Sequence, residues 1–443
     1  MNNELVFSRR PSAFPETSEF TFKHALLHDV AYDTVLLSER PTLHQRAAEW
    51  LNNVVGERRD EYLEEIAGHL LLADKRDQAA GLLVEAAARA LSSGDASSGR
   101  RLVEAAFGIS ATVAAERNGH LMLAKACRLL GDLNAAEEEA DRAIKLGATA
   151  GDDAAVVAAI HEAFFVSEAQ GAHERGRALV LRDLPIAERL GGTGFTRMLA
   201  CSAWSDLNAG DLDGARLNAA ANLQRAEQDG DGEILIEAHK ISGNVASAVG
   251  RHDEALAHEH RILELAAESG DLKEPAVCHL NTGVAWHYLA DSTNDEGCYD
   301  SAQPEYEEAL VLTRRLGLRA YQEQALGNLA QLRVRRGQLD VGRTHARECL
   351  TLATTIGART NALFAVLVHA EATFEATGSP DALAHIVVVR CDPSLGRVSA
   401  EVSDVIDRLR SSHPDVDIDH YLEAGASLDF DDVVQHILDG PSS

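Results

Sequence analysis

The 443-residue sequence lacks most of the signals that mark enzymes, nucleic-acid-binding proteins and membrane proteins. It has no Gly-x-x-x-x-Gly-Lys-Ser/Thr loop, and so no lysine-bearing cradle for nucleotide phosphates. Asp and Glu outnumber Lys and Arg by 70 to 41, and the net charge of −29 argues against non-specific binding to nucleic acid or anionic membranes. No apolar run approaches the roughly 18 residues of a transmembrane helix. We therefore expect a cytoplasmic protein with no membrane partner and no direct nucleic-acid partner.

Disulfide and strand signals are also missing. The six cysteines are scattered without a Cys-x-x-Cys pair, which indicates a reducing compartment and no structural disulfide. Aromatic residues make up only 5% of the sequence, and the alternating apolar pattern of strands is nearly absent. These absences predict a mostly helical protein.

Three short patterns invite a catalytic or metal-binding interpretation, and each has a simpler one. Gly191-Gly-Thr-Gly resembles a phosphate loop, but it follows a helical stretch and no lysine comes next, so we interpret it as a turn. His24 and His28 share a helix face, but Ala-Leu-Leu lies between them instead of the glutamate of a zinc protease. His258 and His260 point to different faces of a helix. We predict a non-enzyme with no catalytic residue, no cofactor and no metal.

One short phrase, which reads Gly131-Asp-Leu-Asn-Ala-Ala in its first copy, recurs through most of the chain. Copies begin at Gly131, Gly171, Gly210, Gly250, Gly337 and Gly378, and a further copy begins at Gly297 after an insertion from Asp291 to Gly297. The intervals between adjacent regular copies are 39 to 41 residues. A period near 40 with helical sequence on both sides predicts stacked helical hairpins.

Small residues recur at fixed distances from this phrase. They are Ala124, Ala203, Gly243, Gly283 and Ala330 before the turn, and Ala136, Ala215, Ala255 and Ala302 after it. Small side chains let the two helices of a hairpin approach closely, and the glycine supplies a left-handed turn residue. This spacing resembles the tetratricopeptide (TPR) repeat in its longer form of about 40 residues.

A second resemblance lies near the amino terminus. The matching residues are Phe22, His24, Ala25, Leu26, Val30, Ala31, Tyr32, Leu36, Arg40, Leu43, His44 and Ala47. This segment resembles the end of the winged-helix module in AAA/STAND-type ATPase regulators, of the kind fused to class III adenylate cyclases or LuxR-type activators, where it leads into a TPR-like array. The resemblance implies an upstream ATPase, yet only 21 residues precede Phe22, so we expect a short relative, a truncated product or a C-terminal piece.

The same resemblance gives His24 a candidate role. In related switches a winged-helix histidine can touch the phosphate of the bound nucleotide, and His24 is the matching residue here. The alternative is a histidine that packs inside its module.

These observations define a predicted fold class and three parts. The fold class is all-α: a right-handed TPR-like helical-hairpin solenoid with a small N-terminal winged-helix remnant. Residues 1–57 form the remnant and a linker helix, residues 58–386 form the solenoid, and residues 387–443 form a C-terminal helical cap. In this last part, apolar residues at helical spacing predict one amphipathic helix: Val398, Val402, Val405, Ile406 and Leu409.

A curved helical array presents one helix of each hairpin on its concave side, where an extended peptide can lie. Asn281 and Asn328 occupy the same repeat position on that helix, Asn244 lies on it nearby, and Arg335 lies close to a turn. An amide can donate to and accept from a peptide backbone, and arginine can bind a carboxylate. The alternative is that the asparagines only satisfy neighbouring helices.

Two functions follow from these candidates. We predict a regulatory module that binds a protein or peptide partner in signal transduction. The alternative is the effector-sensing C-terminal arm of an ATP-dependent STAND-type regulator that controls a cyclase or transcription, with a small-molecule effector as its ligand.

Overall fold

The computed structural model describes residues 5–9, 11–12, 14, 17–110, 113–293, 295–395, 398–423 and 428–440. Contacts divide the chain into two compact units. The first unit contains residues 1–89 and 98–122, and the second unit contains residues 90–97 and 123–443. Among the described residues, none of the helices combines the length and apolar character needed to cross a bilayer.

The first unit contains the two strands of the described chain. These strands, β1 (Val6–Arg9) and β2 (Glu19–Phe22), pair antiparallel with Val6 opposite Phe22. Helices follow the strands: α1 (Ala25–Asp33), α2 (Arg40–Val54), the 3-10 helix η1 (Gly56–Tyr62), α3 (Leu63–Leu72), most of α4 (Arg76–Ser92), most of α5 (Ala96–Ile109) and the first half of α6 (Val113–Leu130). A small core of Ala48, Leu51, Val55 and Ile66 joins α2 to α3. The winged-helix assignment of this segment stays a prediction.

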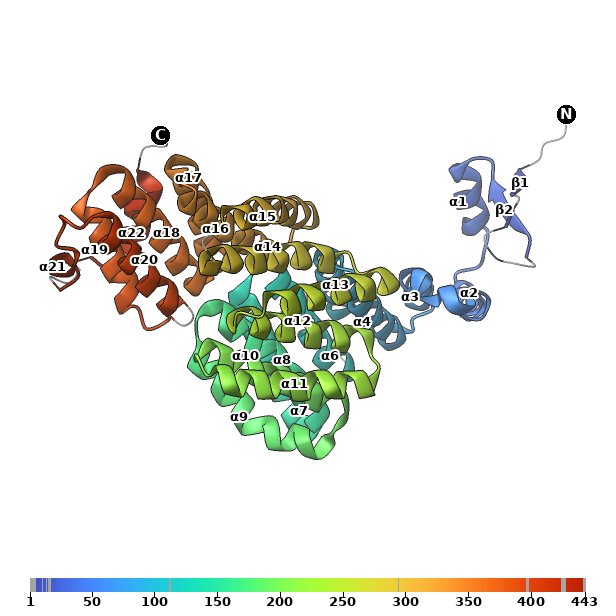
Figure 1. Cartoon of the computed structure of the whole chain (residues 1–443). Helices are drawn as coiled ribbons and strands as arrows, with labels where there is room; N and C mark the ends of the chain where they lie inside the picture. Colours follow the sequence, from blue (N-terminus) through green and yellow to red (C-terminus); the bar gives the residue numbers. More distant parts are fainter. Residues whose placement is uncertain are drawn as a thin grey trace. The chain divides into compact units, whose positions relative to one another are not determined.

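The second unit is a run of helical hairpins (Figure 1). Its complete helices are α7 (Leu133–Ala150), α8 (Asp153–Gln170), α9 (His173–Leu190), α10 (Gly192–Asn208), α11 (Leu212–Asp229), α12 (Gly232–Ala248), α13 (His252–Ser269), α14 (Lys273–Thr293), α15 (Glu296–Leu316), α16 (Arg319–Arg335), α17 (Leu339–Ile356), α18 (Arg359–Thr377), α19 (Pro380–Cys391), α20 (Val398–Ser412), α21 (Ile418–Glu423) and α22 (Phe430–Asp439). This order confirms the predicted all-α hairpin array.

The turns form as the recurring phrase predicts. Gly131 adopts a positive φ of 81°, and the backbone N–H of Asp132 then donates to the carbonyl of Cys127 at 2.8 Å, which closes the end of α6. The aspartate side chain in turn accepts from the N–H of Ala135 and caps α7. Such a cap contributes about 1 kcal/mol to helix stability. Asp152, Asp211 and Asp231 repeat the same capping bond at later turns.

The copy of the phrase at Gly297 behaves differently. We predicted a turn there, but Gly297 lies inside the first turn of α15, and Asp295 caps that helix by accepting from the Gly297 N–H at 2.9 Å. The insertion lengthens both helices of this hairpin to 21 residues, against 17 to 19 in the other hairpins from α8 to α18. The extra residues are therefore absorbed as helix, and the turn moves upstream of the glycine.

Small residues let the hairpin helices approach closely, as predicted. Ala124, Ala136, Ala203 and Ala215 are fully buried. At Gly283 the contact is closer than any side chain permits, because a Cβ placed there would lie 2.6 Å from the ring of Tyr306.

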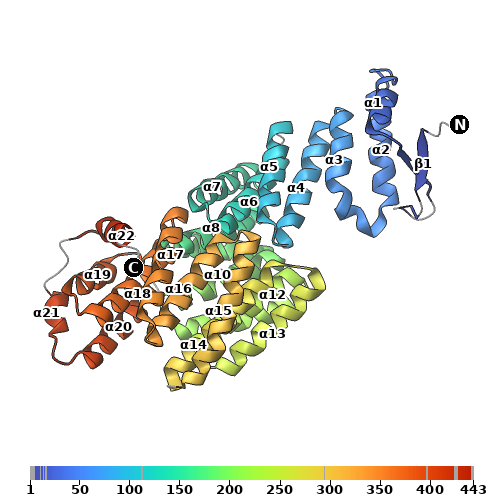
Figure 2. The same ribbon diagram turned by 90° about the horizontal axis from the view of Figure 1, so that it is seen from above.

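The even-numbered helices from α8 to α18, together with residues 123–130 of α6, which belong to the second unit, are called the inner helices below and lie on the concave side of the array. Inner helices of adjacent repeats contact one another directly, from α8 and α10 to α16 and α18, whereas the odd-numbered helices pack mainly against their neighbours in sequence. Figure 2 shows the same succession of hairpins from above.

The array also contacts itself across distant repeats. Helix α8 contacts α18, and a Cβ placed on Gly171 would lie 2.8 Å from the hydroxyl of Thr360. At another point, the N–H of Leu272 donates to the carbonyl of Ser93 at 3.3 Å. Successive turns of the superhelix are therefore in contact within the second unit.

The helices after the repeats join the same core. Val398, Val402, Val405, Ile406 and Leu409 of α20 are all buried, which confirms the predicted amphipathic helix. Phe430, Val433 and Ile437 of α22 belong to the same cluster as Leu363 and Leu383 in α18 and α19. The predicted part boundaries at 57/58 and 386/387 stay predictions, and α19 continues across residue 386.

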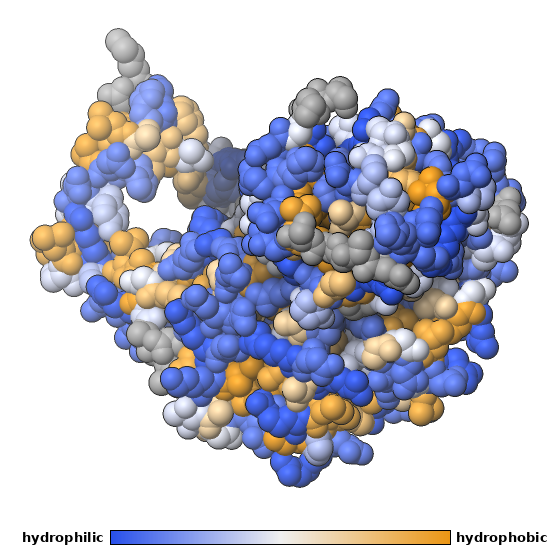
Figure 3. All heavy atoms as spheres, turned by 90° about the vertical axis from the view of Figure 1, so that its left-hand side faces the viewer, coloured by the Kyte–Doolittle hydropathy of each residue, from blue (hydrophilic) through white to orange (hydrophobic). Residues whose placement is uncertain are grey.

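Hydrophilic side chains cover most of the face shown in Figure 3, with small apolar areas between them. This agrees with the net charge of −29. Five of the six cysteines are buried, Cys391 is exposed, and all six are free thiols.

Candidate functional site

The concave face of the inner helices carries polar side chains in three regions. Two of them contain residues that the sequence proposes for partner binding. The three regions differ in whether their charges are already paired within the chain.

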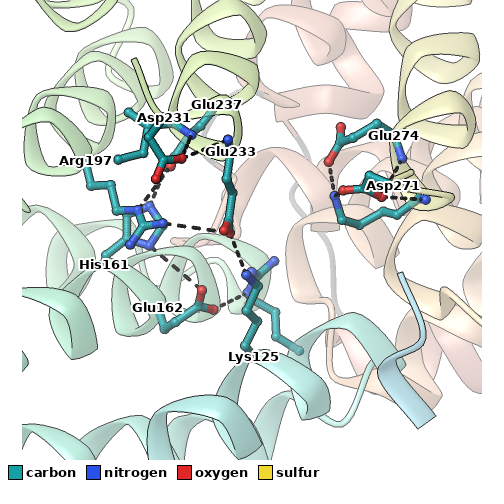
Figure 4. Close-up of polar contacts among 12 residues, drawn as sticks. Lys125, His161, Glu162, Arg197, Asp231, Glu233, Glu237, Asp271 and Glu274 are labelled. Carbon is teal, nitrogen blue, oxygen red and sulfur yellow. Dashed lines mark hydrogen bonds and ion pairs between the residues drawn. The ribbon is translucent and has the colours of Figure 1, made fainter. Parts of the chain in front are cut away.

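The first region is a charged network on α6, α8, α10 and α12 (Figure 4). Lys125 of α6 donates to Glu233 of α12 at 2.8 Å, and Arg128 of α6 donates to Glu162 of α8 at 2.9 Å. Burial raises the pKa of Glu162, but the cations around it, Arg128 first, outweigh burial and lower that pKa to about 2.

The remaining charges of this network are paired as well. His161 of α8 is hydrogen-bonded to Glu237 of α12, which Arg197 of α10 also approaches, at 3.7 Å. These side chains therefore connect the inner helices of four repeats, α6, α8, α10 and α12. We interpret the network as a structural connection between repeats, since each of these carboxylates already has a cation beside it.

The second region is a slot between α12 and α14 with α13 as its floor. Asn244 and Ser247 of α12, Glu259 of α13 and Asn281 of α14 line a cavity of about 10 Å³. Asn281 Nδ2 donates to Glu259 Oε1 at 3.1 Å, and Asn244 Nδ2 donates to the carbonyl of Lys240 at 2.9 Å. The structure thus brings two of the predicted binding residues to one small polar opening.

The third region lies on α14, α16 and α18, where α20 packs against the array. Arg335 of α16 has a side chain only 6% exposed, and it forms ion pairs with Asp404 of α20 at 2.8 Å and with Glu371 of α18 at 3.4 Å. Arg408 of α20 donates to the same Glu371 oxygen at 2.7 Å. Arg335, which the sequence offers to a partner's carboxylate, therefore holds carboxylates of its own chain.

Two predicted residues lie outside these contacts. Asn328 is half-buried on α16. His24 is the exposed N-cap residue of α1 in the first unit and has an extended backbone conformation, with φ −140° and ψ 141°. The packed-interior alternative for His24 is wrong for this conformation, because its side chain faces solvent. Its nucleotide-sensing role stays a prediction.

Sequence reasoning missed Glu259 and Glu371, two buried acids in the array. Burial raises the pKa of each to about 7. Both stand at repeat positions that other copies fill with small or apolar residues, and this departure from the repeat is a signal that the sequence contains.

Solved structures similar to this chain share its architecture. Rap protein complexed with competence and sporulation factor aligns with a TM-score of 0.57 at 13% identity, over 78% of this chain and 94% of Rap. NprR in complex with its cognate peptide NprX aligns with a TM-score of 0.51 at 15% identity, over 77% of this chain and 96% of NprR. A STAND protein with a TPR sensor from Pyrococcus horikoshii has a TM-score of 0.43 at 12% identity, over 91% of this chain and 58% of its own.

No family model and no curated protein matches the sequence. The likeness to Rap and NprR shows the fold, a TPR-like helical solenoid, and confirms the predicted class.

Proposed function

We propose that the second unit is a non-catalytic regulatory module that binds an extended peptide, or such a segment of a partner protein, along the concave face of its inner helices. The observation that carries this proposal is the slot at Asn244 and Asn281, where amides from two adjacent inner helices border one polar opening. An amide side chain can donate to a peptide carbonyl and accept from a peptide N–H at once. The solved structures of Rap and NprR, which share the fold, contain a bound factor or peptide.

Asn328 and Arg335 extend the proposed contact surface along α16. Arg335 can bind a carboxylate of a partner only if it releases Asp404 of α20. Binding at this end of the groove is therefore in competition with an internal ion pair, whereas Asn244 and Asn281 at the slot each make one hydrogen bond within the chain, to the Lys240 carbonyl and to Glu259.

The test is a titration of fluorescently labelled pools of short random peptides, followed by polarisation. Each neutral hydrogen bond contributes about 0.5–1.5 kcal/mol, so replacing both Asn244 and Asn281 by alanine is expected to weaken binding roughly tenfold. Asn53→Ala, at an exposed position of the first unit, is the matched control and should bind as the unmodified protein does. Circular dichroism checks that the array remains folded. Equal affinity of the double variant and the unmodified protein contradicts the proposed site.

A second candidate function is the effector-sensing arm of an ATP-dependent STAND-type regulator that controls a cyclase or transcription. The observation in its favour is α1, which has no buried residue and exposes the apolar side chains of Leu26 and Val30 from the N-terminal phrase. An exposed apolar helix of this kind needs another surface to cover it. Immunoblotting of the native cells tests this candidate: a polypeptide clearly longer than 443 residues supports it, and a band at that length alone contradicts it.

A further inference from the structure

Glu259 is an acidic residue at a repeat position where the other copies have apolar residues or tyrosine. The corresponding position lies nine residues after the glycine of the recurring phrase. In the other copies it is Ala140, Val180, Ala219, Tyr306, Ala346 or Val387, and all of these are buried. Glu259 is just as buried, at 4% exposure. A carboxyl group at such a position is costly unless something pairs with it.

Only half of this carboxyl group has a partner. Oε1 accepts from Asn281 at 3.1 Å, whereas Oε2 is buried and has no hydrogen-bond partner within bonding distance among the described residues. The nearby Cys278 thiol, which donates to the Glu259 backbone carbonyl at 3.7 Å, opposes the rise that burial causes in the pKa of the carboxyl. The nearby cation, Lys240, is held by Glu274 at 2.6 Å. Gly243 leaves room beside the carboxyl, since a Cβ there would lie 3.3 Å from Oε1. Glu259 therefore lines the slot between α12 and α14 and has one buried oxygen without a hydrogen-bond partner among the described residues.

A second buried acid, Glu371, shows how a carboxyl group inside this array can be paired with a cation. Glu371 stands at a position that other copies fill mostly with small residues, and it receives a guanidinium from outside the repeats, because Arg408 of α20 donates to it at 2.7 and 2.9 Å. Both acids have pKa values raised to about 7 by burial, so each gains from a cation brought against it. Glu259 is equally buried, but among the described residues no cation forms an ion pair with it, because Lys240 is held by Glu274.

The size of the slot favours a compact cation. A cavity of about 10 Å³ holds one water-sized group. An ammonium group has that size and donates three hydrogen bonds, while a planar guanidinium is larger. Asn244, Ser247 and Asn281 around the opening offer further polar contacts to an ammonium group.

We propose that Glu259 is the specificity-determining residue of the concave site and that it binds an ammonium group of the peptide, either a lysine side chain or the amino terminus. This inference rests on the proposed function and adds the chemistry of the ligand to it. The neutral asparagines hold the peptide backbone, and the buried carboxylate selects which peptide enters.

The experiment compares short peptide pools that differ only in their cation. One pool carries lysine at a fixed position, one carries norleucine there, one carries arginine, and each is made with a free and with an acetylated amino terminus. We expect the unmodified protein to bind one ammonium-bearing form roughly tenfold more tightly than its neutral counterpart, as a charge-assisted hydrogen bond provides. The lysine and amino-terminus arms identify the source.

Glu259→Gln is the test variant, because it keeps the shape and the contact with Asn281 but removes the charge. It should bind the neutral pools normally and lose the preference for the ammonium group. Glu254→Gln is the matched control, since it makes the same change at an exposed position of the same helix and should keep the preference.

Each result decides between the proposals. Peptide binding with no preference between lysine, norleucine and acetylated forms overturns the role of Glu259 and leaves the proposed function standing. A preference that survives in Glu259→Gln also overturns it. Failure of every pool to bind contradicts the proposed function together with this inference.

Discussion

Replacing Glu259 by glutamine should make the array more stable at neutral and alkaline pH and leave it nearly unchanged in acid. Burial raises the pKa of Glu259 from its ordinary value of 4.5 to about 7, so the folded protein favours the protonated form. The stability this proton provides is present in full below about pH 4.5 and is lost as the pH rises through about 7. One pKa unit corresponds to about 1.4 kcal/mol, so the loss between about pH 5 and pH 8 is roughly 2–3 kcal/mol. Glutamine is neutral throughout and should not show this loss.

The assay is urea unfolding of both proteins at several pH values in that range, followed by circular dichroism. The quantity to compare is the difference in unfolding free energy between Glu259→Gln and the unmodified protein, because Glu371, His239 and His258 titrate in both and cancel. That difference should grow with pH, while Glu254→Gln should show no such growth. A difference that stays constant from acid to alkaline pH would refute the argument that Glu259 is buried without a cation.

Two further predictions test the packing. Gly283→Ala should lower the unfolding free energy by about 1–3 kcal/mol, because the added Cβ would lie 2.6 Å from the ring of Tyr306; unchanged thermal unfolding would contradict this close contact. Arg408→Ala should lower the unfolding free energy by about 1–3 kcal/mol, because it removes the contact with buried Glu371, and it should accelerate amide exchange in α20. The side chain of Arg410 pairs only at the surface, so Arg410→Ala should leave exchange in α20 nearly unchanged. Equal exchange in the two variants would contradict the role of Arg408.

The fold could be predicted because its turns and helix caps depend on local sequence signals. Gly131 and Asp132 show why: the glycine tolerates a positive φ, the aspartate caps the next helix, and both effects act within a few residues. The turn at Gly297 was predicted wrongly because helices lengthen cooperatively, and seven extra residues extend α14 and α15 instead of forming a loop.

The candidate site was less accessible to such reasoning. Asn244 and Asn281 could be placed on inner helices from their repeat positions, and the structure puts both beside one slot. The partners of Arg335 could not be predicted, because Asp404 lies 69 residues away on a helix outside the repeat pattern. The sequence shows Glu259 as an acid at a repeat position that holds apolar residues or tyrosine in the other copies. It does not show that the carboxyl lacks an ion-pair partner, because that depends on the direction of the Lys240 side chain.

The contacts between distant repeats have a consequence for how this array comes apart. In an open solenoid each repeat depends only on its neighbours, so the ends unzip independently. Here α8 rests on α18, and Lys125 is joined to Glu233 across two intervening hairpins. Loss of the last hairpins therefore withdraws support from the first ones, and the second unit should unfold with greater cooperativity than its repeat number alone implies.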